Sequence, residues 1–139
     1  MPESVQQVMT RDPVCCDATT TLFDAADLMK SKEIGGVIVI DHGKVCGIVT
    51  DRDIVVRGVA CGLDPKTTPL HKICSKQLVT ISPADTVDRA VDIMRQKTIR
   101  RLPVCEGGKV VGIVSLGDLA VDLAPKSVLA KISAAPAND

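Results

Sequence analysis

Two segments of the chain share a pattern of residue types that suits the binding of a sugar phosphate. They are Gly47-Ile48-Val49-Thr50-Asp51-Arg52-Asp53 and Gly112-Ile113-Val114-Ser115-Leu116-Gly117-Asp118. If a helix begins at the hydroxyl residue, its unpaired N–H groups and positive dipole end attract an anion. The aspartate three positions further on can accept hydrogen bonds from the two hydroxyls of a ribose. The leading glycine lets the backbone approach a ligand closely. The pattern therefore predicts a nucleotide site at each helix start.

The same residues also have a purely structural interpretation. A hydroxyl residue followed three positions later by a carboxylate can form a capping box, in which both side chains bind backbone N–H groups at the start of a helix. Because such helix starts are common, a single copy would favour the structural interpretation. Two copies in the same register strengthen the case for a site.

The two segments belong to a longer internal repeat. A constant shift of 65 positions places Thr21 on Thr86, Met29 on Met94, and Gly43-Lys44-Val45 on Gly108-Lys109-Val110. Such self-similarity at a fixed period is typical of a chain built from two copies of one structural unit.

Each unit shows the same succession of patterns: a short extended segment, a helix, a β-hairpin and the start of a second helix. In the first unit these are residues 14–16, 21–32, 37–40 with 45–50, and a helix from Asp51. In the second they are residues 79–81, a helix with Asp85 at its N-cap, 102–105 with 110–115, and a helix from Leu116. We therefore expect an α+β fold of two βαββα units packed about a pseudo-twofold axis as one compact module. The units are placed at residues 7–59 and 71–124, with a linker at 60–70 and a tail at 125–139.

The composition excludes several classes of function. The 139 residues carry 17 basic and 17 acidic side chains, and Phe23 is the single aromatic residue. Such a chain has neither the basic field nor the aromatic platforms that nucleic acids use, so no nucleic-acid partner is expected. The longest apolar run, residues 35–40, is too short to span a bilayer, and the N-terminus does not resemble a secretory signal. We expect a cytoplasmic protein without a membrane partner.

The six cysteines do not form a recognisable chemical motif. They contain no C-x-x-C pair, and His42 and His71 lack the spacing of zinc ligands. In a cytoplasmic protein reduced thiols are expected, so we predict neither a disulfide framework nor a metal site. The adjacent Cys15 and Cys16 leave a redox role open. No Ser-His-Asp or Cys-His constellation is visible, which argues against an enzyme.

The repeated βαββα pattern and its terminal motif resemble the CBS domain, and the doubled unit resembles the tandem CBS pair over residues 7–123. The stretch from Gly47 to Pro65 is also similar to small stand-alone CBS pairs of the hypoxic-response type. The resemblance implies a non-catalytic regulatory module that binds AMP, ADP, ATP or S-adenosylmethionine in two clefts between the repeats, with no required cofactor. It also implies a homodimer that acts on a separate effector protein, which the sequence does not identify. A ligand-free scaffold remains the alternative.

The resemblance assigns roles to individual residues. Thr50 and Asp53 would hold the ribose in one cleft, and Ser115 and Asp118 in the other. The base pockets would be lined around Val14, Cys16, Thr80, Val37 and Leu102.

The two halves differ where the family contacts phosphate. The second half has Arg100 and Arg101 before Leu102, whereas the first half has Gly35 and Gly36 before Val37. Arginines form charge-assisted bonds to phosphate, so Arg100 or Arg101 would bind it, together with Arg52. The alternative is that Arg100 and Arg101 form exposed ion pairs, which are common and weak. Because Leu116 and Gly117 replace Asp51 and Arg52, the second cleft has less charge beside its aspartate, and one of the two sites is expected to be empty or weak.

Overall fold

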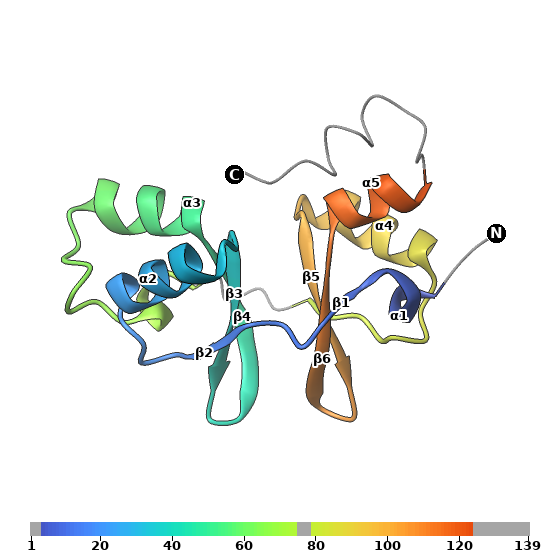
Figure 1. Cartoon of the computed structure of the whole chain (residues 1–139), viewed down its shortest axis with the longest axis horizontal. Coiled ribbons are helices and arrows are strands. Elements are labelled where there is room, and N and C mark those ends of the chain that lie inside the picture. The colour runs from blue at the N-terminus through green and yellow to red at the C-terminus, as the bar shows by residue number, and fades with distance from the viewer. Residues whose placement is uncertain (1–3, 75–78, 124–139) are drawn as a thin grey trace. The chain divides into compact units, whose positions relative to one another are not determined.

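The computed structural model describes residues 4–74 and 79–123. The described residues form two compact units, one made of residues 14–74 and one made of residues 4–13 together with 79–123. Figure 1 shows the chain with the elements of both units labelled. The predicted tail at 125–139 lies outside the described residues.

The unit of residues 14–74 is a three-stranded sheet with helical segments. Its strands are β2 (Cys15–Asp17), β3 (Gly36–Asp41) and β4 (Lys44–Thr50), in the order β2-β3-β4. Strand β2 is parallel to β3, and β3 and β4 form an antiparallel hairpin. The helical segments are α2 (Leu22–Lys32), α3 (Asp51–Asp53), the π-helical η1 (Ile54–Gly58), and the 3₁₀ turns η2 (Val59–Cys61) and η3 (Leu70–Lys72).

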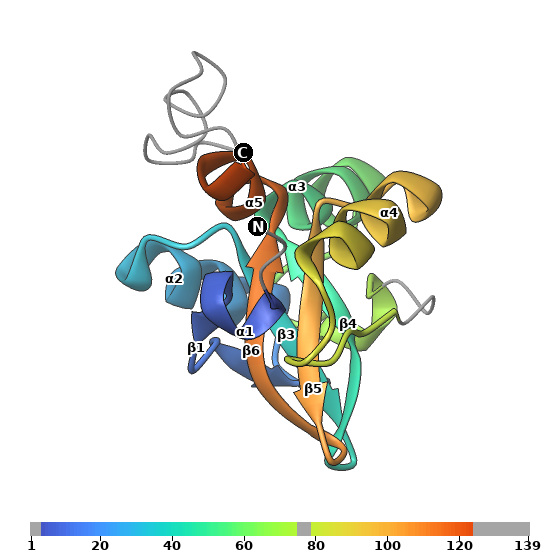
Figure 2. The ribbon, with the colours of Figure 1, turned by 90° about the vertical axis from the view of Figure 1, so that its right-hand side faces the viewer.

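The other unit combines the second repeat with the start of the chain. Its elements are α1 (Val5–Val8), β1 (Thr10–Arg11), α4 (Val87–Lys97), β5 (Arg101–Glu106), β6 (Lys109–Ser115) and α5 (Leu116–Leu123). The sheet order is β1-β6-β5, with Thr10 opposite Ile113. Helices α4 and α5 lie at the end of the β5–β6 hairpin opposite its turn, as Figures 1 and 2 show.

The predicted repeat is confirmed down to local irregularities. The hairpins lie where they were predicted, and each contains a bulge at the equivalent step, between Val39 and Ile40 and between Val104 and Cys105. Helices α2 and α4 each end with a left-handed residue, Glu33 or Thr98, at φ 54° in both cases. Equivalent sequences have therefore folded into equivalent α+β units.

The predicted N-cap at Asp85 is wrong. The N-cap of α4 is Thr86, whose hydroxyl accepts a hydrogen bond from the Arg89 N–H at 3.1 Å. Asp85 instead accepts a hydrogen bond from the Ser82 N–H at 3.0 Å and so closes the preceding turn. Thr21 caps α2 in the same way as Thr86 caps α4.

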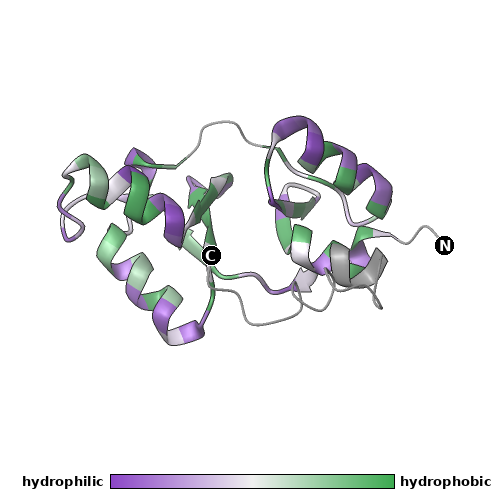
Figure 3. Cartoon of the chain, turned by 90° about the horizontal axis from the view of Figure 1, so that it is seen from above, coloured by the Kyte–Doolittle hydropathy of each residue, from purple (hydrophilic) through white to green (hydrophobic). Residues whose placement is uncertain are grey.

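Each unit has its own aliphatic core. Fully buried side chains in the first include Leu22, Val39, Val49 and Leu70, and those in the second include Val5, Leu102, Val104, Val114 and Leu119. In α2 and α4 the buried residues recur at helical spacing, as Leu22, Ala25 and Met29 and as Val87, Ala90 and Met94. Figure 3 shows hydrophobic and hydrophilic residues alternating around the helices.

The extended segments that precede the first helices differ between the units. Residues 15–17 form strand β2, whereas the equivalent region of the second unit contributes a single bridge between Ile81 and Val104. In that unit the free edge of β6 is covered instead by β1 from the start of the chain. No helix among residues 4–74 and 79–123 is long and apolar enough to cross a membrane.

Candidate functional site

Both motif segments form capping boxes. The Thr50 hydroxyl accepts a hydrogen bond from the Asp53 N–H at 3.1 Å, and the Asp53 Oδ2 accepts one from the Thr50 N–H at 2.9 Å. Ser115 and Asp118 make the same two bonds, at 3.1 and 3.2 Å. The structural interpretation of the motif is therefore confirmed at both helices. A bond to ribose is an additional role that the remaining carboxylate oxygen, Oδ1, can supply.

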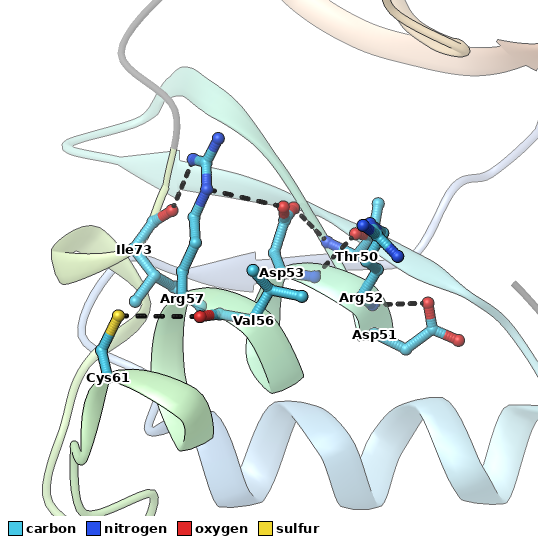
Figure 4. Close-up of polar contacts among 8 residues, drawn as sticks. All are labelled: Thr50, Asp51, Arg52, Asp53, Val56, Arg57, Cys61 and Ile73. Atoms are coloured by element: carbon cyan, nitrogen blue, oxygen red, sulfur yellow. Dashed lines mark hydrogen bonds and ion pairs between the residues drawn. The ribbon is translucent and has the colours of Figure 1, made fainter.

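In the first unit a cation and a backbone carbonyl lie next to the capping carboxylate. The Arg57 Nε is 3.9 Å from the Asp53 Oδ1, and the Arg57 Nη1 donates a hydrogen bond to the Ile73 carbonyl at 3.3 Å. Figure 4 shows the guanidinium lying between these two groups. The sequence analysis missed Arg57, although a position four residues beyond an aspartate in a helix would have indicated an ion pair.

The N–H groups at the start of the first helix already have acceptors, so the predicted unpaired amides are not found there. The Asp51 N–H donates to the Gly35 carbonyl at 3.0 Å, and the Arg52 N–H donates to the Asp51 side chain at 2.8 Å. The Asp53 N–H is bound by Thr50, as described above. An anion at this helix start would have to be held by side chains.

The second helix start differs at one of these amides. The Leu116 N–H donates to the Arg100 carbonyl at 2.8 Å, which matches the Asp51 contact. However, Leu116 has no acceptor group that could bind the next N–H, that of Gly117. Since α5 continues for eight residues, its N-terminus keeps both the helix dipole and an amide suited to an anion.

Two of the three predicted arginines, Arg100 and Arg101, lie beside the second helix start. Arg101 begins β5 and is paired with Ser115 on β6, and Arg100 directly precedes it. Arg52 and Arg100 are exposed, and neither forms an ion pair with an aspartate or glutamate of its own unit in the part of the chain that the structure describes. The ion-pair alternative is therefore not realised for Arg100.

The predicted base-pocket residues are buried to different degrees. Val37 and Leu102 are core residues, with 1% and 0% exposure. Cys16 is buried, Val14 is half-buried and Thr80 is exposed. In each unit the strand residue lies beside its motif, because Val37 pairs with Val49 and Leu102 with Val114.

Burial affects the thiols of the first unit. Desolvation raises the pKa of Cys15, and desolvation together with the neighbouring Cys15 raises the pKa of Cys16. A raised pKa lowers the fraction of reactive thiolate at neutral pH, so any oxidation of this pair would be slow there. Burial, and to a smaller extent an interaction with the Cys46 thiol, raises the pKa of Cys74 to about 12.

The described residues contain no group of three or more His, Cys, Asp or Glu side chains that could hold a metal ion.

Known proteins share this fold and this sequence pattern. The profile of the CBS domain matches residues 5–58 and 70–124. The chain therefore belongs to the CBS domain family, and its two repeats make it a CBS pair, a module of the regulatory class.

Several individual proteins are similar to this chain in sequence or in structure. The CBS domain-containing protein YhcV of Bacillus subtilis is 40% identical over 119 residues, which cover 86% of this chain and 84% of YhcV. Hypoxic response protein 1 of Mycobacterium tuberculosis is 28% identical over 132 residues, covering 94% of this chain and 92% of that protein. A crystal structure of hypoxic response protein I with two coordinated zinc ions is similar at a TM-score of 0.77, with 28% identity, and covers 85% of this chain and 97% of that one. The CBS domain pair of protein MJ0100, solved with 5′-methylthioadenosine and S-adenosylmethionine, shares the fold at a TM-score of 0.79 and 23% identity, covering 91% of this chain and 100% of that one.

Proposed function

We propose that this CBS pair is a sensor that binds an adenine nucleotide, AMP or ATP, and catalyses no reaction. The observation that carries the proposal is the matched pair of helix starts, at which Asp53 and Asp118 are fixed by their capping bonds in the same geometry. Capping uses the Oδ2 atom of each carboxylate, and the Oδ1 atom can accept hydrogen bonds from ribose hydroxyls. A carboxylate held rigidly in this way loses little conformational entropy when it binds a ligand.

The phosphate is assigned to the second helix start. The Gly117 N–H and the dipole of α5 point to an anion there, and Arg100 and Arg101 begin the strand paired with Ser115. Arg52, at the first helix start, is exposed, and its positive charge would contact the phosphate of a nucleotide bound at the first site. Because the first helix start has its N–H groups occupied, we expect the second to bind phosphate more strongly.

The position proposed for the base and the proposed homodimer are those expected for the CBS family. The base would lie against the aliphatic surroundings of Val14, Cys16, Val37, Thr80 and Leu102. The MJ0100 pair shows that this fold can hold adenosyl ligands, although its likeness to this chain concerns the fold alone. Exposed Val55, Val56 and Val59, at 59%, 45% and 59%, form an apolar patch on the helix after the first motif, which supports a homodimer. Signalling would then pass to an effector protein in the cytoplasm.

Isothermal titration with AMP, ATP and S-adenosylmethionine tests the proposal. Asp118→Asn keeps an oxygen that can cap the Ser115 N–H but removes the charge, so it separates ligand binding from capping. A lost hydrogen bond to a charged group corresponds to a roughly 10- to 100-fold loss of AMP affinity. The matched control is Asp85→Asn, since Asp85 also binds a backbone N–H but lies outside both motifs.

A second titration tests the phosphate contact. Arg101→Ala should weaken ATP binding by roughly tenfold, as expected for a charge-assisted contact. An unchanged ATP affinity would remove Arg101 from the site.

A ligand-free scaffold is the second candidate, and the completed capping boxes favour it because they give the motif a role without a ligand. If the unaltered protein binds none of the three ligands, the scaffold is the better description.

A further inference from the structure

Two thiols of the first unit, those of Cys46 and Cys74, interact next to the strand that leads into the first motif. Cys46 is a half-buried residue of β4, and Cys74, 7% exposed, follows the η3 turn. Their side chains lie close enough to interact, and both pack in the core of this unit. All six cysteines of the chain are free thiols in this structure. The second repeat has Val111 at the position equivalent to Cys46, so the pair is specific to the first unit.

The Cys46–Cys74 pair is connected to the proposed ribose site. Cys74 follows Ile73, whose carbonyl accepts the hydrogen bond from Arg57, and Arg57 faces the Asp53 Oδ1. Both Asp53 and Arg57 lie close enough to the Cys74 thiol to act on it electrostatically. Figure 4 shows the part of this connection that runs from Ile73 through Arg57 to Asp53. A movement of Cys74 would therefore shift the Asp53 carboxylate through the Ile73–Arg57 hydrogen bond and the Arg57–Asp53 ion pair.

We propose that Cys46 and Cys74 are a redox-sensitive pair that closes to a reversible disulfide and thereby weakens nucleotide binding at Asp53. The two thiols already interact, as the partners of a disulfide must. The disulfide fixes Cys74 to β4 and keeps the Ile73 carbonyl beside Arg57. Arg57 then remains against the Asp53 Oδ1, which is less available to a ribose hydroxyl.

The oxidant is a peroxide, which is small enough to reach a half-buried thiol. Cys46, the more exposed of the two, attacks the peroxide; the O–O bond breaks, a sulfenic acid forms at Cys46, and one water (from hydrogen peroxide) leaves. Cys74 then attacks the Cys46 sulfur, the S–S bond forms, the S–O bond breaks, and the hydroxyl leaves with the Cys74 proton as a second water. Two thiols have lost two electrons to one peroxide. A thiol reductant reverses the closure.

Peptide mapping of the unaltered protein tests the disulfide directly. Trypsin separates Cys46, in residues 45–52, from Cys74, in residues 73–76, and leaves Cys61 and Cys105 on other peptides. After treatment of dilute folded protein with hydrogen peroxide, a change to pH 9 and alkylation of the remaining thiols, we expect a cross-linked peptide joining residues 45–52 to 73–76, which dithiothreitol releases. The variant Cys46→Ala should lack it, whereas Cys61→Ser, a change at an exposed thiol, should keep it. If both peptides stay fully alkylated while Cys15 or Cys61 is oxidised, the proposal is wrong.

The effect on binding rests on the proposed function and is measured separately. AMP titration is carried out on reduced and cross-linked protein carrying Asp118→Asn, so that the signal comes from the Asp53 site. We expect the cross-linked form to bind several-fold more weakly, and Arg57→Met to abolish the difference between the two forms. Equal affinities in the two forms would overturn the coupling. Absence of AMP binding in both forms of the otherwise unaltered chain would count against the proposed nucleotide site, while the cross-linked peptide would still decide the disulfide.

Discussion

At the scale of single residues, one carboxylate serves two purposes in each unit. Asp53 and Asp118 complete the capping boxes and are also the groups proposed to bind ribose. The two purposes do not conflict, because capping occupies one carboxylate oxygen and holds the side chain in a fixed rotamer. The difference between the units lies in the neighbours. Arg57 faces Asp53, whereas the equivalent position of the second repeat is an aspartate, Asp122.

The raised pKa of Cys74 makes a prediction about pH. Burial and the interaction with Cys46 raise this pKa to about 12, so the thiol is almost entirely protonated at neutral pH. Closure of the disulfide requires the Cys74 thiolate, because only the thiolate is nucleophilic. The thiolate fraction, and with it the closure rate, should therefore rise roughly tenfold per pH unit well below the pKa. We expect the Cys46 sulfenic acid, trapped with dimedone, to persist at pH 7 and to give way to disulfide at pH 9.

A closure rate that does not depend on pH would count against the attack of Cys74 on the Cys46 sulfenic acid. If closure proceeds at the same rate at both pH values, Cys74 is not the residue that attacks. The first oxidation step can be held constant by adding peroxide at one pH and then changing the pH after the excess has been removed.

At the scale of elements, the helix after the first motif departs from its counterpart. It passes from α-helical Asp51–Asp53 into the π-helical segment Ile54–Gly58, whereas α5 is α-helical over Leu116–Leu123. Gly58 lies against α2, and a Cβ built on it would be 2.7 Å from the Leu22 Cδ1. Leu22 is fully buried and has little room to move. The glycine is therefore required by the packing of two helices.

Gly58→Ala tests this packing, because two effects predict opposite results. In an exposed helix alanine stabilises relative to glycine by up to about 1 kcal/mol. Here overpacking against Leu22 should dominate and lower the free energy of unfolding by about 1–3 kcal/mol. Urea denaturation followed by circular dichroism measures the change, with Cys61→Ala at an exposed neighbouring position as the control. A stabilised Gly58→Ala protein would show that Leu22 yields to the added methyl group.

The elements show which features the sequence could predict. Hairpins, capping boxes and repeat register depend on local patterns. The hairpins and the register were predicted correctly, and the capping boxes were one of the two interpretations of the motif. Thr86 and Asp85 are adjacent and both favoured at N-caps, so composition alone could not decide between them. The π-helical turn, the pairing of β1 with β6 and the contact of Cys46 with Cys74 join residues by tertiary packing, for which a single sequence carries no pattern. Whether the predicted site residues bind a ligand is likewise a matter for the titrations.

At the scale of the whole chain, its first residues are part of the unit that contains its last described strands. Val5 is fully buried in the second core, and its N–H donates to the Asp85 carbonyl at 2.8 Å. The Gln6 N–H donates to the Pro83 carbonyl at 3.0 Å, and Thr10 pairs with Ile113. The second unit is thus completed by a segment that precedes the first in sequence.

This arrangement predicts that a change at the start of the chain destabilises the second unit selectively. Val5→Ala removes two buried methyl groups and should lower the free energy of unfolding of that unit by on the order of 2 kcal/mol. Hydrogen exchange followed by mass spectrometry should show faster exchange for peptides of β5 and β6, with β3 and β4 little changed, because stability can differ between parts of one chain. Gln6→Ala, at an exposed neighbour, is the control. Equal loss of protection in both units would mean that they unfold as one cooperative body, and the effect at Val5 could then no longer be assigned to the second core.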